Sequence, residues 1–239
     1  MKKINTILAA VGALLMLSVT SANSVEFKAG VSANGMAAYA NATETLKGDG
    51  AGTGGQTGRT TSEEAILAAS FASVFAEISS DEIMGLALGV SFAPDVVEMD
   101  KETRHVDPVN SDSGNDAAGA QQVGGEVKDL LTVYVTLPVG GNGAYVKAGY
   151  NQATLNTLET LSTGSTYANV DLNGYTVGGG YEGEINDMIF WRAEGTYQMW
   201  DDIAANGSEA NAASGDNTTN RITAELGSVT GTLSVGMKF

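Results

Sequence analysis

Apolar and polar side chains alternate along the last segment of the chain, residues 232–239. Successive side chains of a β-strand point to opposite faces, so such a segment has one apolar face and one small or polar face. The apolar face carries Leu233, Val235, Met237 and Phe239, and the other face carries Thr232, Ser234, Gly236 and Lys238. The pattern predicts an amphipathic strand, which suits either the wall of a membrane barrel or a soluble β-sandwich.

Eight segments of this kind, each long enough to cross a membrane as a tilted strand, follow one another along the chain. They are residues 25–38, 63–79, 82–93, 126–138, 143–155, 169–183, 188–201 and 219–239. Their connections are alternately long (39–62, 94–125, 156–168, 202–218) and short (80–81, 139–142, 184–187). Bacterial outer-membrane barrels join their strands by short periplasmic turns and longer outer loops. The sequence therefore predicts an all-β protein, an eight-stranded antiparallel up-and-down transmembrane β-barrel.

Aromatic residues on the predicted outer face lie toward the ends of the strands, where the interfacial girdles of membrane barrels are found. They are Tyr150, Tyr175, Tyr181, Trp191, Tyr197 and Phe239. A soluble sandwich would show the same alternation, but it requires neither a terminal aromatic residue nor a regular alternation of long and short connections. The membrane reading is favoured on these two grounds.

Two segments leave their register open. In residues 63–79 either parity is acceptable, and we assign Ile66, Ala68, Ala72, Val74, Ala76 and Ile78 to the outer face because this choice turns Glu77 inward. In residues 219–239 the apolar parity changes between Ile222 and Leu233. A β-bulge near Gly227–Ser228 would reconcile the two halves. Alternatively, the first half projects beyond the membrane.

The beginning of the chain has the features of a secretory signal peptide. Lys2 and Lys3 precede an apolar run over residues 7–19, and small residues follow at 20–22. The run is too short for a spanning helix, and we expect cleavage after Ala22. Residues 1–22 are thus predicted to be a cleaved signal peptide and residues 23–239 the outer-membrane barrel domain.

Composition narrows the classes of function. Without Lys2 and Lys3 the chain has 10 basic and 28 acidic residues, a formal net charge of −18. Such acidity argues against nucleic acid as a partner. The chain has no cysteine, which excludes disulfides and thiolate chemistry. We expect no cofactor.

Charged residues recur at inward-facing positions of the predicted strands. They are Glu26, Lys28, Glu77, Lys128, Lys147, Glu182, Arg192, Glu194 and Lys238. An eight-stranded barrel is barely wide enough for its own side chains. Buried charges without partners cost several kcal/mol each, so these residues are predicted to form a neutralising network that fills the lumen. The alternative is a narrow ion path, which would make the protein a small passive porin.

The chain resembles the family of small outer-membrane barrels that includes the OmpA transmembrane domain and OmpX. The resemblance covers about residues 25–239, and its most specific element is the ending Ser234-Val235-Gly236-Met237-Lys238-Phe239. It implies insertion into the outer membrane of a Gram-negative bacterium by the barrel-assembly machinery, with Phe239 as the assembly signal. It also implies contact with outer-membrane lipids and lipopolysaccharide, and a role in envelope integrity, adhesion or surface recognition.

Catalytic and metal-binding readings are weaker. The single histidine, His105, lies between Glu102 and Asp107, but no Gly-x-Ser-x-Gly nucleophile motif is present. The acidic groups 95–102, 107–116 and 201–202 lack the spacing of a calcium loop and would at most associate weakly with divalent cations. We therefore expect a monomeric, non-enzymatic protein with no catalytic or metal site, which acts through its outer loops.

Overall fold

The computed structural model describes residues 25–46, 59–80, 84–106, 119–158, 167–207 and 221–239. These residues form one antiparallel sheet and contain no helix. Its strands are β1 (Val25–Leu46), β2 (Arg59–Ser80), β3 (Leu86–Val106), β4 (Gly119–Pro138), β5 (Ala144–Thr157), β6 (Val170–Glu184), β7 (Ile189–Trp200), β8 (Ile203–Asn206) and β9 (Arg221–Lys238).

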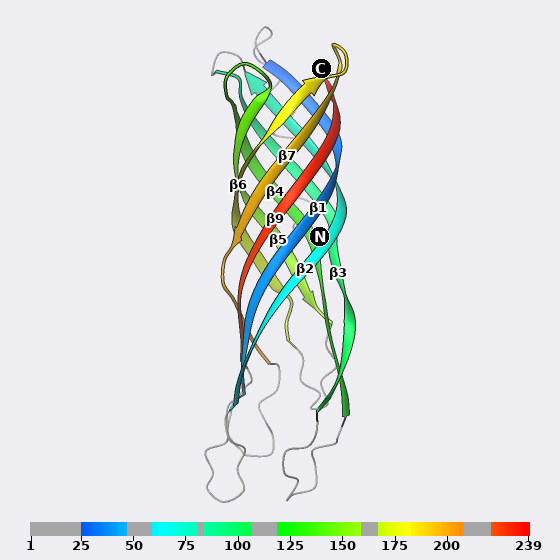
Figure 1. Ribbon diagram of the computed structural model, residues 1–239, viewed down its shortest axis with the longest axis vertical. Helices are drawn as coiled ribbons and strands as arrows, with labels where there is room; N and C mark the ends of the chain where they lie inside the picture. The colour runs from blue at the N-terminus through cyan, green and yellow to red at the C-terminus, as the bar shows by residue number, and fades with distance from the viewer. Residues whose placement is uncertain (1–24, 47–58, 81–83, 107–118, 159–166, 208–220) are drawn as a thin grey trace, which may run out of the picture.

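The sheet closes on itself as a barrel (Figure 1). Each strand from β1 to β6 pairs with the next along the chain, β7 pairs with β9, and β9 pairs with β1 over Lys28–Thr45. The short β8 continues the line of β7 along β9, so β7 and β8 together fill one position in the wall. The barrel thus has eight strand positions, and the predicted fold class is confirmed.

The short connections and the end of the chain lie at one end of the barrel. Residues 139–143 and 185–188 join β4 to β5 and β6 to β7 there. By the general rule for bacterial barrels we expect this end to face the periplasm, so we call it the periplasmic end and the opposite one the outer end. The signal peptide predicted over residues 1–22 lies outside the described residues and stays a prediction.

Several boundaries predicted from the sequence are wrong at the outer end. Residues 39–46, 59–62, 94–106 and 119–125 were expected to be loop, but they belong to strands β1 to β4. Apolar alternation fades in these stretches, whereas strand pairing continues between polar residues. For example, Thr43 and Ser62 share a hydrogen bond of 3.0 Å across β1 and β2. Such cross-strand hydroxyl pairs stabilise a sheet without any apolar pattern.

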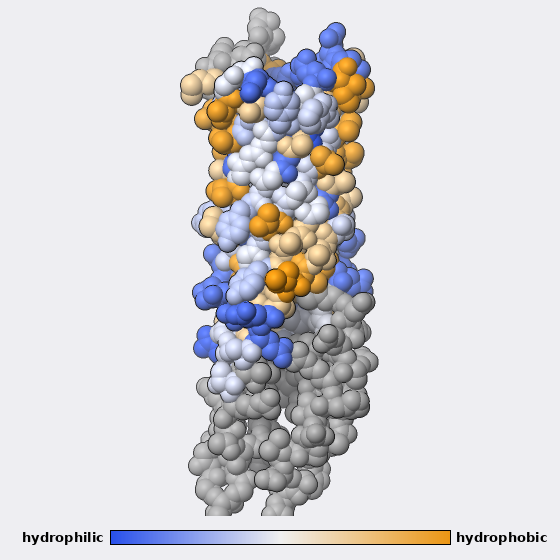
Figure 2. Space-filling model, in the orientation of Figure 1, coloured by the Kyte–Doolittle hydropathy of each residue, from blue (hydrophilic) through white to orange (hydrophobic). Residues whose placement is uncertain are grey.

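The outer surface of the barrel carries a belt of exposed apolar side chains. Members on strands β1 to β9 include Val31, Val74, Leu88, Val133, Val135, Val146, Val177, Val229, Leu233, Val235 and Met237. Hydrophobic side chains follow the flanks of the barrel in Figure 2, and hydrophilic ones gather below them. On β9 the belt runs from Val229 to Phe239, which corresponds to about 25 Å for a strand tilted as in known barrels. We call this surface the apolar band.

Aromatic side chains mark both margins of the apolar band. Tyr181 contacts Trp191 at the periplasmic margin, with ring centroids 5.8 Å apart, and Tyr150 contacts Tyr175 at the outer margin, with centroids 5.6 Å apart. All six aromatic residues predicted to face outward are exposed, as are Ile66 and Val74 on β2. The parity chosen for β2 is therefore right.

No helix within the described residues is long and apolar enough to cross a membrane.

The predicted bulge at Gly227–Ser228 is absent. Strand β9 pairs with β1 without any shift of register from Arg221 to Lys238. Ala224 and Leu226 therefore keep the parity of Ser228 and point into the lumen, where they pack against a buried apolar cluster. The parity of apolar residues changes because the lumen itself becomes apolar at this level.

Candidate functional site in the barrel lumen

Arg192 of β7 is the centre of a buried ionic cluster. Its Nη1 and Nη2 atoms donate hydrogen bonds to the two carboxylate oxygens of Glu77 on β2, at 2.6 and 2.7 Å. The side chains of Arg192 and Glu77 are only 4% and 1% exposed. A two-pronged guanidinium–carboxylate pair has fixed geometry and strong, charge-assisted hydrogen bonds. This pair therefore joins two distant strands across the lumen.

Glu182 of β6 extends the cluster toward the periplasmic end. One of its oxygens accepts a hydrogen bond of 2.7 Å from Arg192 Nη2, and the other accepts one of 2.6 Å from Lys28 Nζ. Lys28 is also 3.2 Å from a carboxylate oxygen of Glu26. Five of the nine charged residues predicted for the lumen thus lie in one continuous chain of ion pairs.

Tyr134 of β4 connects this chain to a second ion pair. Its hydroxyl donates a 2.8 Å hydrogen bond to Glu77, while Lys147 Nζ lies 3.9 Å from the centroid of its ring. Lys147 in turn donates a 2.9 Å hydrogen bond to Glu194. An ammonium ion over an aromatic face is attracted by the ring's negative face. We call the connected set Glu26, Lys28, Glu77, Tyr134, Lys147, Glu182, Arg192 and Glu194 the ionic layer.

Aromatic rings surround the guanidinium of Arg192. The Arg192 Cζ atom is 5.3 Å from the centroid of Phe75, 5.2 Å from that of Tyr145 and 5.5 Å from that of Phe190. Phe190 is fully buried. Phe190 has the same strand parity as Arg192, and the structure shows that it packs around the charged group.

Lys238 pairs at the periplasmic rim with a residue that sequence reasoning did not include. Its ammonium group donates a hydrogen bond to Glu184, whose side chain is 66% exposed. Glu184 was assigned to a short turn, although it is the last residue of β6 and has the inward parity of Glu182. Lys238 lowers the pKa of the Glu184 carboxyl by hydrogen bonding and by its charge.

Lys128 does not belong to the lumen, and its predicted inward position is wrong. Its neighbour Val127 packs against the buried cluster inside the barrel, so Lys128 faces the other way. The pairing of β4 with β5 shifts between Lys128 and Leu131, where Asp129 has a φ of 56°. This bulge reverses the parity of the residues before it. Lys128 pairs instead with Glu126 at 2.8 Å, beyond the outer margin of the apolar band.

The balance of charge in the lumen differs from the predicted one. Without Lys128 and with Glu184, the basic residues are Lys28, Lys147, Arg192 and Lys238, and the acidic ones are Glu26, Glu77, Glu182, Glu184 and Glu194. Each of these residues is within 4 Å of an oppositely charged partner. The arrangement satisfies the requirement that buried charges be paired.

A buried apolar cluster lies in the outer half of the lumen. Its centre is Ala153, Leu172 and Ile203, from β5, β6 and β8. Partly buried residues pack against it: Val127, Leu130, Leu155, Val170, Trp200, Ala224 and Leu226. We call this set the apolar layer. It was not predicted, because a polar lumen was assumed along the whole barrel.

Phe239 lies on the outer face at the junction of the first and last strands. Its ring is 69% exposed, and its centroid is 5.8 Å from that of Phe27. The backbone N–H of Phe239 donates a 2.9 Å hydrogen bond to the carbonyl of Phe27. The terminal residue thus takes part in closing the barrel.

The side chains of the residues considered as catalytic candidates lie outside the described part of the structure. This holds for Glu102 and His105, whose backbone belongs to β3, and for Asp107. Among the described residues, no group of three or more His, Asp or Glu side chains is placed to hold a metal ion.

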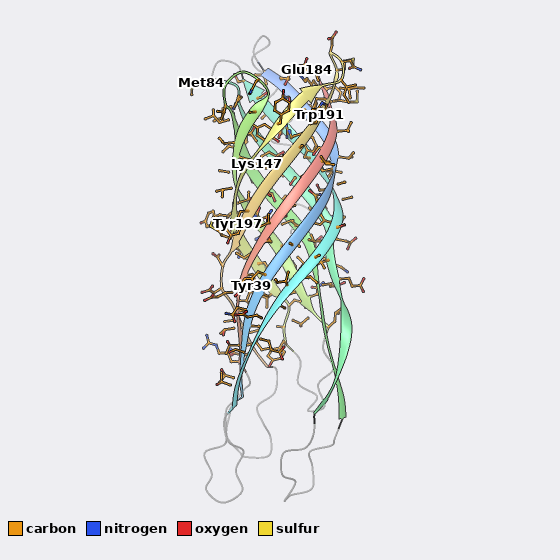
Figure 3. All side chains as sticks on the ribbon, viewed as in Figure 1. Tyr39, Met84, Lys147, Glu184, Trp191 and Tyr197 are labelled. Atoms are coloured by element: carbon orange, nitrogen blue, oxygen red, sulfur yellow. The ribbon has the colours of Figure 1, made fainter. Side chains whose placement is uncertain are left out.

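Figure 3 shows Lys147 between the short-turn end, marked by Met84 and Glu184, and the level of Tyr39.

Comparisons with known proteins give likeness of fold only. No protein-family model and no curated protein matches the sequence. Among solved structures, the outer-membrane protein OprG of Pseudomonas aeruginosa has 12% identity and a TM-score of 0.46, over 90% of this chain and 96% of its own. The outer-membrane protease OmpT of Escherichia coli has 13% identity and a TM-score of 0.44, over 92% of this chain and 100% of its own.

A third similar structure is the attachment invasion locus protein Ail of Yersinia pestis, with 9% identity and a TM-score of 0.38, over 88% of this chain and 99% of its own. Likenesses this distant carry no argument about function. The fold assignment rests on the closed strand order and the apolar band of this chain. The narrower resemblance to OmpA and OmpX stays a prediction.

Proposed function

We propose that this protein is a non-enzymatic, monomeric barrel of the Gram-negative outer membrane, closed to ions and active through its outward connections. The membrane location is supported by the apolar band and its aromatic margins, since a surface of this kind is stable only against lipid. Outer-membrane lipids and lipopolysaccharide would then be its immediate surroundings. Recognition is assigned to the outward connections because loops on a rigid scaffold are free to vary.

The observation that carries the proposal is the Arg192–Glu77 pair. It lies across the lumen, is almost completely buried, and is held in place by Glu182 and Tyr134. An ion passing this level would have to separate a bidentate ion pair, which would leave the buried Glu77 carboxylate without a cation in hydrogen-bond contact. The apolar layer, which offers no ligand to an ion, lies in the same lumen. Together they favour a structural or surface-interaction role over that of a passive porin.

Conductance in planar bilayers tests this proposal. The purified protein, shown by protease protection to be inserted, is expected to give no large, steady, ion-selective current under conditions in which a known porin conducts. Such a current would overturn the closed-lumen proposal and establish the porin alternative.

Shortening the outward connections tests where recognition resides. Variants in which the connection 47–58 or the connection 107–118 is shortened are expected to keep the folded barrel and to lose adhesion to host cells or extracellular matrix. Shortening the periplasmic turn 139–143 is the matched control and should leave adhesion unchanged. Equal adhesion by all three variants would contradict a role for the outward connections.

Phe239 is proposed to be the signal read by the barrel-assembly machinery. Its ring is exposed on the outer face, where it contacts the ring of Phe27. A Phe239→Ala variant should accumulate unassembled in cells but refold normally from urea into lipid vesicles. If refolding in vitro fails equally, Phe239 acts through stability rather than through recognition.

A further inference from the structure

One junction in the barrel wall is paired over only part of its length. Strands β2 and β3 are hydrogen-bonded from Val74–Phe92 to Ser80–Leu86. Beyond this point β2 continues to Arg59 paired with β1, and β3 continues to Val106 paired with β4. The β1–β2 and β3–β4 hairpins diverge toward the outer end (Figure 1). Within the described strands, residues 59–73 of β2 and 93–106 of β3 thus have one unpaired edge each. We call this opening the seam.

Pro94 gives a physical reason for the position of the seam. It lies two residues after Phe92, the last residue of β3 that pairs with β2. Proline has no N–H to donate to a neighbouring strand, so within sheets it occurs at edges and bulges. Pro94 is exposed, and the β3–β4 register shifts just after it, between Asp95 and Val97. The sequence therefore terminates the β2–β3 ladder at this position.

The seam begins within the apolar band. Ser73 is the first residue of β2 that has no partner on β3. On its other edge it pairs with Ser32 of β1, and Ser32 pairs with Ser234 of β9. The neighbours of Ser234, Leu233 and Val235, are exposed members of the band. Unpaired backbone groups are strongly unfavourable in hydrocarbon and are tolerated at this depth only where they line a water-filled space or are covered by protein. The seam is therefore a place where the wall has to admit water or a polar molecule.

A polar cavity of about 60 Å³ lies in the lumen directly behind the seam. Phe71 and Ser73 of β2 and Ala93 of β3 line it from the two sides of the seam, and Ser91, paired with Phe75, lines it next to the seam's start. Hydroxyl and amide groups line the rest, among them Asn34, Asn151, Thr176, Thr196, Gln198 and Thr230. A space of this volume has room for about four water molecules, or for one small organic molecule that takes up the same space.

Asn151 leaves a hydrogen-bond donor unused at this cavity. Its Oδ1 accepts a 3.0 Å hydrogen bond from Thr132, but its Nδ2 has no partner among the described residues, although the side chain is only 1% exposed. A buried donor without an acceptor is unfavourable, because the hydrogen bond it made to water in the unfolded chain is not replaced. The Nδ2 group of Asn151 is therefore available to donate a hydrogen bond to a molecule in the cavity.

The cavity is enclosed along the barrel axis. Tyr134, Lys147 and Glu194 of the ionic layer line it on the periplasmic side, and Leu130 of the apolar layer lines it on the outer side. Lys147 and Glu194 neutralise each other, so the walls offer no net charge to an ion. We propose that the cavity binds a small, uncharged molecule carrying hydroxyl or amide groups, which reaches it sideways between β2 and β3.

Acetamide, which has both an acceptor oxygen and a small size, is the probe for the binding step. In ¹⁵N-labelled protein in nanodiscs, titration with acetamide should shift the side-chain amide signal of Asn151 in a saturable way. The side-chain amide of Asn173, on the outer face of β6, is the control and should not saturate. Absence of a saturable shift at Asn151 would overturn the assignment of the cavity as a site for this class of ligand.

Closing the seam tests the route. Ala72 and Pro94 lie two residues beyond the last β2–β3 pair, Val74–Phe92, on opposite edges of the seam, and both are exposed on the outer face. Because the chain has no cysteine, the variant Ala72→Cys/Pro94→Cys can be bridged selectively with a bifunctional methanethiosulfonate. The bridged form is expected to lose the acetamide shift, and reduction of the bridge should restore it, so that each sample is its own control for folding.

A matched bridge at a fully paired junction completes the experiment. Ala33 and Leu233 pair across β1 and β9 and are both exposed. Bridging Ala33→Cys/Leu233→Cys should leave the acetamide shift unchanged. An acetamide shift that persists when the β2–β3 bridge is closed would overturn the lateral route, whether or not the lumen conducts ions.

Discussion

The two halves of the lumen are closed by opposite chemistry. Near the periplasmic end, the ionic layer joins β1, β2, β4, β5, β6 and β7 through charged groups and one tyrosine. Near the outer end, the apolar layer packs Ala153, Leu172 and Ile203 against each other with no charged member. Both layers fill a space too narrow to be left empty, yet they respond to substitution in different ways.

The contrast allows two sources of stability to be told apart: the pairing of charges in the ionic layer and the filled volume of the apolar layer. A buried ion pair gains little over an apolar pair of the same size, but it becomes a large liability when one partner is removed. An apolar layer loses stability in proportion to the volume taken out of it. The ionic layer should therefore be sensitive to single substitutions and tolerant of matched double ones, whereas the apolar layer should show no such rescue.

Replacement of Arg192 by Met is expected to have the largest effect. It leaves Glu77 with no cation in hydrogen-bond contact, and breaking a buried pair in this way typically costs about 3–5 kcal/mol. Urea unfolding of the protein in lipid vesicles, followed by the shift in gel mobility between folded and unfolded barrel, measures the change.

The double variant Glu77→Leu/Arg192→Met is the matched control for this prediction. It removes both charges and keeps the volume, while Glu182 retains its contact with Lys28. Most of the lost stability should return. A double variant as unstable as Arg192→Met would show that the layer depends on the residues themselves and not on charge pairing.

Leu172→Ala is expected to have the next largest effect. Leu172 is 4% exposed at the centre of the apolar layer, and truncation of a buried leucine costs about 2–5 kcal/mol. Leu172→Met keeps the volume and should cost less than about 1.5 kcal/mol. The same urea unfolding assay compares them. Equal losses for Ala and Met would contradict volume as the determining quantity.

Most of the ionic layer could be predicted from the sequence, because apolar alternation placed Glu182, Arg192 and Glu194 on the inner face of their strands. Glu77 needed a further argument, since its strand allowed either parity and the inward choice rested on where its charge would lie. Which charges meet across different strands could not be predicted, because the partners of Lys28 and Arg192 on other strands lie 10 to 154 residues away and their contact depends on register.

Three features could not be predicted from the sequence, each for a different physical reason. The bulge at Asp129 reverses parity without a glycine to mark it, which misplaced Lys128. Ala224 and Leu226 continue a regular strand whose lumen changes from polar to apolar. The polar outer ends of β1 to β4 pair without apolar alternation. In each case the missing information lies in a neighbouring strand, not in the local pattern.

The rim pair of Glu184 and Lys238 is expected to give a smaller, pH-dependent effect. Lys238 holds the pKa of Glu184 below its ordinary value of 4.5. A depressed folded-state pKa contributes stability above the unfolded value and loses it as the pH falls through the folded value. Unfolding midpoints at pH 6 and pH 3 should therefore differ less in Lys238→Met and in Glu184→Gln than in the unmodified protein. An unchanged difference in both variants would show that the pair is uncoupled from folding.

Lys128→Met is expected to have the smallest effect, and it sharpens the contrast with Arg192→Met. Both substitutions remove a cation that pairs with glutamate, but the Lys128 side chain is 39% exposed and lies outside the lumen. Exposed ion pairs contribute little to stability because water solvates the separated charges. The urea midpoint should stay unchanged, while the pKa of Glu126, which Lys128 lowers, should rise in a carboxyl NMR titration. A destabilisation comparable to that of Arg192→Met would place Lys128 inside the barrel and contradict the bulge at Asp129.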